Sequence, residues 1–311
     1  MEAASIPAGT PARRRSRGLS ERRLAAYMVS PSLTLIALVA AYPIIYAIWL
    51  SLHEYSVRVA GLSRWAGPIG MRNYTTVLWG DRSAEFWDAV RTTFVFTGFS
   101  VTFELLIGLG MALAMHAAFR GQGLLRTVVL VPWAVLTVVT AIMWRTIFDP
   151  TLGFVNAVLG TNTVWLGQEP QALMVMIIAD VWKTAPFMAL LILAGLQVIP
   201  GEIYEAAKVD GASMWQRFTR ITLPLLMPAI LVALIFRTLD ALRIFDLPFV
   251  LTKGAHGTNT LSLESYQTFL ANNIIGLGSA MAVLTFIIVM VVSFLYIRFV
   301  GGNIRGMAEE G

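Results

Sequence analysis

Six long apolar stretches run along the chain, separated by shorter segments that hold most of the charged residues. A transmembrane helix needs about 20 mostly apolar residues to cross the hydrocarbon core of a bilayer. The first stretch is nearly twice as long as the roughly 7–15-residue core of a signal peptide, so we interpret it as a retained helix. The pattern predicts an all-α integral membrane protein with six transmembrane helices, at Leu24–Leu52, Thr92–Ala118, Thr127–Phe148, Ala172–Ile199, Leu223–Leu251 and Leu277–Val300.

The composition of the 311 residues narrows the chemistry that the chain can carry. Apolar residues make up 57% of it and charged residues 13%, against roughly 25% charged in an average soluble domain. The absence of cysteine excludes disulfides and thiolate chemistry. The three histidines, His53, His116 and His256, are too scattered to suggest a metal site, and no nucleophile–base constellation is evident. We therefore expect an integral membrane protein without a metal site or cofactor of its own.

Basic residues are distributed unevenly between the two sides of the predicted helices. Six helices place both termini on one side, and that side holds 13 lysines and arginines against 6 on the other. Because cytoplasmic loops are rich in these residues, both termini are expected in the cytoplasm. Residues 1–23 then form a basic cytoplasmic tail beside the membrane, with no sign of a nucleic-acid partner. Residues 24–300 form the membrane domain and residues 301–311 a second cytoplasmic tail.

The cytoplasmic segment between the fourth and fifth apolar stretches, about residues 200–223, has a distinctive order of residues. Glu205-Ala206-Ala207-Lys208 favours a helix, and Asp210-Gly211 favours a sharp turn after it. Apolar residues recur at helical spacing from Ala212 to Thr222, and Leu223-Pro224 is expected to turn the chain into the fifth span. The segment is predicted to form a short surface helix of small residues, supported by a second helix, which another protein can approach closely.

This segment resembles the EAA loop of permease subunits in bacterial ATP-binding-cassette importers. The family pattern is Glu-Ala-Ala, then Asp-Gly-Ala, then Ile-x-Leu-Pro, and the chain has Glu205-Ala206-Ala207, Asp210-Gly211-Ala212 and Ile221-Thr222-Leu223-Pro224. The resemblance extends over most of the chain after about Glu21. It includes Asn73-Tyr74 and, as in the carbohydrate branch of the family, Asp180-Val181-Trp182-Lys183, Phe236-Arg237-Thr238-Leu239-Asp240 and Gly276-x-Gly278-Ser279-Ala280.

The resemblance implies a multi-pass permease of the bacterial plasma (inner) membrane, part of a type I, binding-protein-dependent importer. Its expected partners are a second permease, two ATPase domains and an extracytoplasmic sugar-binding protein. In this family the EAA loop enters a groove on the ATPase, which assigns the coupling contact to Glu205, Ala206, Ala207, Asp210, Gly211 and Ala212. The chain lacks the phosphate-binding pattern G-x-x-x-x-G-K-[ST], so ATP and Mg are expected on the partner ATPase.

The fifth span holds four charged residues, Arg237, Asp240, Arg243 and Asp246, at successive i+3 positions. Each acid lies beside a base along the predicted helix, so the set is expected to be neutral overall. Charges within a membrane should face protein or water, which leaves two interpretations: the wall of a translocation pathway, or a structural contact with the partner permease. The candidate pathway residues are Trp182, Lys183, Arg237, Asp240, Arg243, Phe245 and Asp246.

Lys183, near the middle of the fourth span, needs a water-lined cavity or an acidic partner. Glu104 in the second span and Asp180 in the fourth are the candidate partners.

The substrate is expected to be a sugar. The pattern is most similar to permeases of trehalose importers, and the balanced charges of the fifth span lean toward a neutral sugar. Maltose or maltodextrin, another oligosaccharide and glycerol phosphate stay open as alternatives. An ion-coupled secondary transporter is a more remote one, because Glu104 is the one isolated acid in mid-span and no half of the sequence repeats the other.

Overall fold

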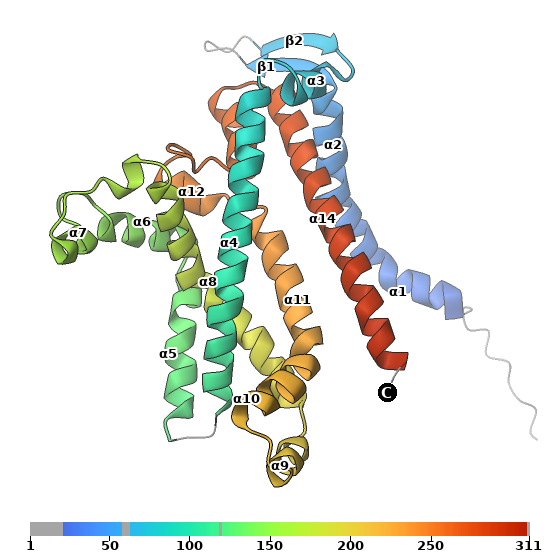
Figure 1. Ribbon diagram of the computed structural model, residues 1–311. Coiled ribbons are helices and arrows are strands. Elements are labelled where there is room, and N and C mark those ends of the chain that lie inside the picture. The colour runs from blue at the N-terminus through green and yellow to red at the C-terminus, as the bar shows by residue number, and fades with distance from the viewer. Residues whose placement is uncertain (1–20, 58–62, 118–119, 310–311) are drawn as a thin grey trace, which may run out of the picture. The chain divides into compact units, whose positions relative to one another are not determined.

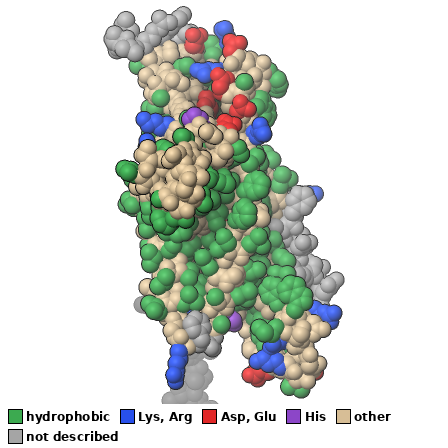
Figure 2. Space-filling view, turned by 60° about the vertical axis from the view of Figure 1, so that its left-hand side comes forward, with side chains coloured by type: hydrophobic (Ala, Val, Ile, Leu, Met, Phe, Trp, Pro, Cys, Tyr) green, Lys and Arg blue, Asp and Glu red, His purple; other side chains and the backbone are tan. Residues whose placement is uncertain are grey.

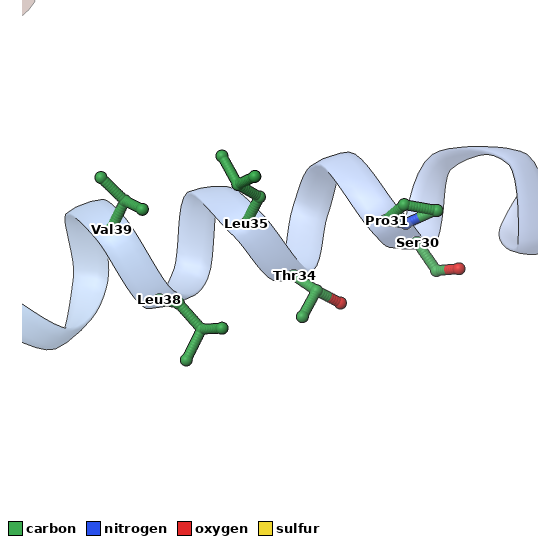
Figure 3. A pocket seen from close by; sticks show the side chains of 6 residues that line it. All are labelled: Ser30, Pro31, Thr34, Leu35, Leu38 and Val39. Carbon is green, nitrogen blue, oxygen red and sulfur yellow. The ribbon is translucent and has the colours of Figure 1, made fainter.

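The computed structural model describes residues 21–57, 63–117 and 120–309. These belong to two units, Met1–Tyr46 and Ala47–Gly311, which we describe separately. In the first unit, α1 (Glu21–Ile36), the π-helical turn η1 (Ala37–Ala41) and the start of α2 (Tyr42–Ser51) form one continuous apolar helix. Figure 3 shows a shallow depression on it, lined by side chains of α1 and η1 alone, which is an exposed helix face rather than an enclosed cavity. Most of the predicted basic tail lies outside the described residues.

Four long helices dominate the second unit (Figure 1): α4 (Ser83–His116), α8 (Gln171–Val198), α11 (Leu223–Ala241) and α14 (Ile275–Glu309). The most extensive contact joins α4 to α8, and α11 packs against both. Small residues permit this close packing: a Cβ on Gly108 would lie 2.9 Å from Met188 Cγ, and one on Gly195 would lie 2.9 Å from Leu226 Cδ1. The apolar core between these helices includes Met115, Met188, Ile192, Leu196 and Leu226.

The helices are compatible in length and composition with a membrane-spanning protein. Among the described residues, five helices are long and apolar enough to cross a bilayer, and a bent pair supplies a sixth if it counts as one span. In Figure 2, hydrophobic side chains cover the middle of the visible face and charged side chains gather toward its two ends. This arrangement matches an apolar bilayer core between two aqueous interfaces.

The third predicted span is not one straight helix. α5 (Gln122–Ala134) and α6 (Thr137–Ile147) meet at an angle of 91°, because Val135 and Leu136 have extended backbone. Pro132 lacks a backbone N–H and weakens the last turn of α5 just before this break. α6 leads through α7 (Phe154–Leu159) and the 3-10 turn η2 (Trp165–Gly167) into α8.

The fifth predicted span is also wrong in its second half. α11 ends at Ala241, and a separate short helix, α12 (Asp246–Leu251), follows. Pro248 cannot donate the backbone hydrogen bond that a continuous helix would send to the Ile244 carbonyl. The Thr260 hydroxyl donates to that carbonyl instead, at 2.9 Å. This contact holds the α11–α12 link against the start of α13 (Leu261–Tyr266), which continues into η4 (Gln267–Ala271).

A small cap closes the end of the second unit that carries the start of α4 (Figure 1). It consists of an antiparallel hairpin, β1 (His53–Val57) with β2 (Ser63–Pro68), and the helix α3 (Arg72–Leu78). Asn73 Nδ2 donates to the carbonyl of Ser51, at the end of α2, and to that of His53, at the start of β1, at 2.8 and 3.1 Å. A Cβ on Gly276 would lie 3.1 Å from the same amide nitrogen, so two motifs far apart in the sequence meet here.

Candidate functional site

The EAA segment forms a helix with a well-defined end, at the opposite end of α4 from the cap (Figure 1). α9 (Gly201–Val209) is followed by Gly211 with φ of +77°, the left-handed conformation that glycine adopts most easily. The amides of Gly211 and Ala212 donate to the carbonyls of Lys208 and Ala207, at 3.1 and 2.9 Å. This pair of bonds is a Schellman motif, which terminates a helix and reverses the chain. The predicted turn at Asp210-Gly211 is confirmed.

A second helix supports α9. In α10 (Met214–Arg217), Ser213 and Gln216 form a reciprocal capping box, with hydrogen bonds of 2.8 and 3.2 Å. α10 runs through the π-helical η3 (Phe218–Thr222) directly into α11, so the predicted turn at Leu223-Pro224 is wrong. Pro224 lacks a backbone N–H, and the wider π-helical turn of η3 directly before it accommodates this proline within a continuous helix.

The surface of this loop is open to a partner. Glu205, Ala206, Asp210 and Gly211 are exposed, while Ala207 and Ala212 are half-buried at the turn. Apolar side chains are exposed beside them: Val209 is 88% exposed and Trp215 is 71% exposed. The Tyr204 and Thr222 hydroxyls are 3.0 Å apart and tie α9 to η3, so the loop is braced from within. An exposed apolar patch on a braced helix is typical of a protein interface.

A cluster of buried charges joins α4, α8 and α11 inside the membrane domain. Arg237 Nε and Nη2 donate to the two carboxylate oxygens of Glu104, at 2.5 and 2.9 Å. Nη2 also contacts Asp180, and Nη1 contacts Asp240 at 3.1 Å. The side chains of Arg237, Glu104 and Asp180 are 2%, 0% and 7% exposed, whereas that of Asp240 is 71% exposed. We call Glu104, Asp180, Arg237 and Asp240 the charge cluster.

The charge cluster corrects two expectations about ion pairing. Removing a charge from water costs several kcal/mol per ion, which only well-placed opposite charges offset. Glu104 and Asp180 meet this need for Arg237, and neither forms an ion pair with Lys183 in the described part of the chain. Of the four charged residues predicted to lie along one helix in the fifth span, only Arg237 and Asp240 form an ion pair in the described part of the chain. The helix ends at Ala241, so Arg243 and Asp246 do not continue the i+3 series on its surface.

The remaining candidate pathway residues lie apart from the charge cluster. Arg243 is exposed and donates to the Leu239 carbonyl, and Asp246 is exposed at the first position of α12. Trp182 and Lys183 are half-buried, and the Trp182 ring contacts that of Trp144 edge to face at 6.0 Å. The Phe245 ring packs against the rings of Phe249 and Tyr266, whose centroids are 5.4 and 4.9 Å away. The structure therefore brings together Arg237 and Asp240 but distributes the other five residues along α8 and the α11–α12 link.

Sequence reasoning does not identify the partner of the buried acids and misses a capping pair. Glu104 and Asp180 are only candidate partners of Lys183 in the sequence, and no local signal reveals that Arg237, 133 positions after Glu104, is the partner of both. Ser213 and Gln216, by contrast, carry the serine-x-x-glutamine spacing of a capping box, which the sequence alone could have disclosed. Among the described residues, no group of three histidine, aspartate or glutamate side chains is placed to hold a metal ion.

Comparison of the chain with known proteins identifies its family. Residues 105–305 match the binding-protein-dependent transport system inner membrane component family. The trehalose transport system permease protein SugA of Mycobacterium tuberculosis is 43% identical over 293 residues, which cover 94% of each chain. The trehalose/maltose transport system permease protein MalF of Thermococcus litoralis is 41% identical over 284 residues, covering 89% of this chain and 94% of the relative.

A solved structure with a similar fold belongs to a bacterial ABC transporter involved in the import of the acidic polysaccharide alginate. The TM-score is 0.75 at 23% identity, with 89% of this chain and 94% of the other covered, so this likeness establishes the fold. The chain belongs to the family of binding-protein-dependent permeases, as its EAA segment predicts. It is a transport subunit and not an enzyme.

Proposed function

We propose that this permease imports trehalose together with a second, homologous permease, two ATPase domains and an extracytoplasmic sugar-binding protein. ATP and Mg bind to the ATPase, and both termini of the permease lie in the cytoplasm. Two relatives are more than 40% identical to this chain over 94% of their own length. Both are named for trehalose transport, which supports this sugar. The positive-inside distribution of lysine and arginine supports the orientation.

The proposed coupling of ATP hydrolysis to transport rests on one observation, the exposed and internally braced loop around α9. The chain enters α9 directly from α8 and leaves it through α10 and η3 into α11. A force applied by the ATPase to Glu205, Ala206, Ala207 and the turn at 210–212 is therefore delivered to the two helices that carry Asp180, Arg237 and Asp240. Closure of the ATPase dimer around ATP would thus move α8 and α11, two of the three helices of the charge cluster, together.

The proposed pathway residues differ in the groups that they have free to contact a sugar. Arg237 is buried and each of its three nitrogen atoms donates to a carboxylate, so it holds helices together. Asp240 receives one of these donors and presents the rest of an exposed carboxylate, which accepts hydrogen bonds from sugar hydroxyls. Trp182, Lys183, Arg243, Phe245 and Asp246 are half-buried or exposed and complete the proposed polar and aromatic lining.

Sugar uptake in cells that lack only this chain tests the substrate. We expect loss of labelled trehalose uptake, restored by the gene, with labelled maltose and labelled glycerol phosphate as comparisons. Loss of maltose or glycerol phosphate uptake alone would leave the permease assignment standing and would replace the sugar. Retention of uptake for all three compounds would contradict all of these substrates.

Substitutions of Gly211 test the coupling loop with a matched control. No heavy atom lies within 4 Å of a Cβ built on Gly211, so a side chain there acts through the backbone angle alone. Asparagine tolerates a left-handed backbone and valine does not. We expect Gly211→Asn to retain sugar-stimulated ATP hydrolysis, and Gly211→Val and Gly211→Pro to lose it while the chain still inserts into the membrane. Equal coupling in all three variants would remove this turn from the ATPase contact.

A further inference from the structure

The buried part of the charge cluster has more acidic than basic groups. It consists of one cation, Arg237, and two carboxyl groups, Glu104 and Asp180, whose side chains are 0% and 7% exposed. If both acids were ionised, one buried negative charge would have no cation to balance it. Asp240, the third acid, is exposed and adds no positive charge. Burial of an unbalanced charge is costly, and an acid avoids that cost by keeping its proton.

The elements packed around the two buried acids supply no second cation in the described part of the chain. Lys183, three residues after Asp180 on α8, is half-buried and forms no ion pair there. The other ionisable side chains of the neighbouring helices contact different groups: Arg126 of α5 donates to the Met115 carbonyl, Arg145 of α6 lies beside Asp149, Glu264 of α13 accepts from Asn259, and Tyr296 of α14 contacts Thr238. The surplus negative charge therefore has to be met by a proton or by an ion from solution.

The hydrogen bonds distinguish the two buried acids. Both oxygens of Glu104 accept from Arg237, at 2.5 and 2.9 Å, and the Thr184 hydroxyl also donates to Oε1, at 2.6 Å. Asp180 accepts from Arg237 through Oδ2 alone. Glu104 is thus arranged as an ionised acid, which accepts at both oxygens, and Oδ1 of Asp180 is the atom that can carry a proton.

Two acceptors lie beside Asp180 and suit a protonated acid. The carboxyl groups of Asp180 and Glu104 are in hydrogen-bond contact, which two ionised carboxylates cannot make because both only accept. The Ser100 hydroxyl is fully buried beside Asp180, without a well-formed hydrogen bond among the described residues. A proton on Asp180 gives these neighbours the donor that they lack.

We propose that Asp180 carries a proton at neutral pH, and that this proton keeps the contact between α4, α8 and α11 electrically neutral. The contact then holds an ionised Glu104, a cationic Arg237 and a neutral Asp180. The folded chain binds one proton more than the unfolded chain, so its stability falls as the pH rises. Asp240 contacts Arg237 and is 71% exposed, which gives the proton a route of exchange. This protonation site goes beyond the proposed function and holds for any imported sugar.

Unfolding of the purified, full-length permease in mixed micelles between about pH 6 and 8 tests the proposal. An unfolded aspartate is ionised throughout this range. We expect the folding equilibrium constant of wild type to fall about tenfold per pH unit relative to that of Asp180→Asn, until the site itself ionises. Asp88→Asn, which changes an exposed acid on α4, is the control and should follow the wild-type profile. Parallel profiles for wild type and Asp180→Asn would overturn the proposal.

Infrared spectroscopy supplies a second readout that needs no unfolding. At neutral pH the wild-type permease should show the carbonyl stretch of a protonated carboxylic acid, which Asp180→Asn should lose and Asp88→Asn should retain. Glu104→Gln should lose it too, because Asp180 then becomes the buried anion that faces Arg237. A wild-type spectrum without such a band would refute the proposal even if the variants do not fold, and so would a band that Asp180→Asn leaves unchanged.

A sodium ion from solution is the alternative source of the missing positive charge. Replacing sodium by a large organic cation at constant ionic strength distinguishes the two sources. We expect the stability of wild type to be the same in both salts. A loss of stability without sodium that Asp180→Asn does not share would assign the charge to a bound metal ion and exclude the proton.

Discussion

Replacement of Arg237 by methionine should destabilise the membrane domain strongly. The change removes the cation that faces Glu104 and Asp180, whose side chains are 0% and 7% exposed. Breaking a buried ion pair from one side costs about 3–5 kcal/mol, because the remaining charge stays buried without a partner. The Thr184 hydroxyl still donates to Glu104 at 2.6 Å, so we expect a value near the lower end. About 3 kcal/mol corresponds to a shift of roughly a hundredfold in the folding equilibrium.

The assay is reversible unfolding of the purified permease in mixed micelles, followed by loss of helical circular dichroism. Arg237→Lys keeps the charge but loses the forked, two-oxygen contact with Glu104, and should fall between wild type and Arg237→Met. Asp240→Asn is the exposed control on the same arginine. Its ion pair with Arg237 is 71% exposed on the acid side, and such pairs contribute about 0–1 kcal/mol.

The order of stabilities is the test of the reasoning. We expect wild type and Asp240→Asn to be close together, Arg237→Lys to be lower and Arg237→Met to be lowest. If Arg237→Met were as stable as Asp240→Asn, the charge cluster would not hold α4, α8 and α11 together, and the burial argument would be refuted.

Three further predictions concern other parts of the chain. Gly108→Val should weaken the α4–α8 contact, because its side chain would collide with Met188. Gly110→Val is the control and should be neutral, because no heavy atom lies within 4 Å of a Cβ at that position. Thermal unfolding of the two variants tests this difference. Asn73→Ala loses two hydrogen bonds, to the carbonyls of Ser51 and His53, and should lower stability by about 1–3 kcal/mol, measured by the same unfolding assay. Asp240→Asn should lower trehalose uptake while the complex still assembles, and wild-type uptake would remove Asp240 from the pathway.

The sequence by itself determined the class of protein and the local structure of the EAA segment. Long apolar stretches predict membrane helices because the bilayer fixes their length, and this signal is local. The break at Asp210-Gly211 is local as well, since a glycine after a helix supplies the left-handed residue of a Schellman turn. Spacing of the EAA segment was sufficient to identify the family. These features depend on neighbours within a few residues, which is why the local sequence is enough to predict them.

Tertiary structure decided how the charges pair and where two of the helices break. Arg237 has one neighbour at i+3 in the sequence, Asp240, yet its two buried partners come from α4 and α8. Only the packing of three helices reveals that those acids compensate Arg237 and not Lys183. The end of α11 likewise depends on Thr260, which satisfies the carbonyl that Pro248 leaves open. Tyr266 joins Phe245 and Phe249 for the same physical reason: residues distant in the chain become neighbours only when helices pack, and a sequence pattern records periodicity within one helix rather than contacts between helices.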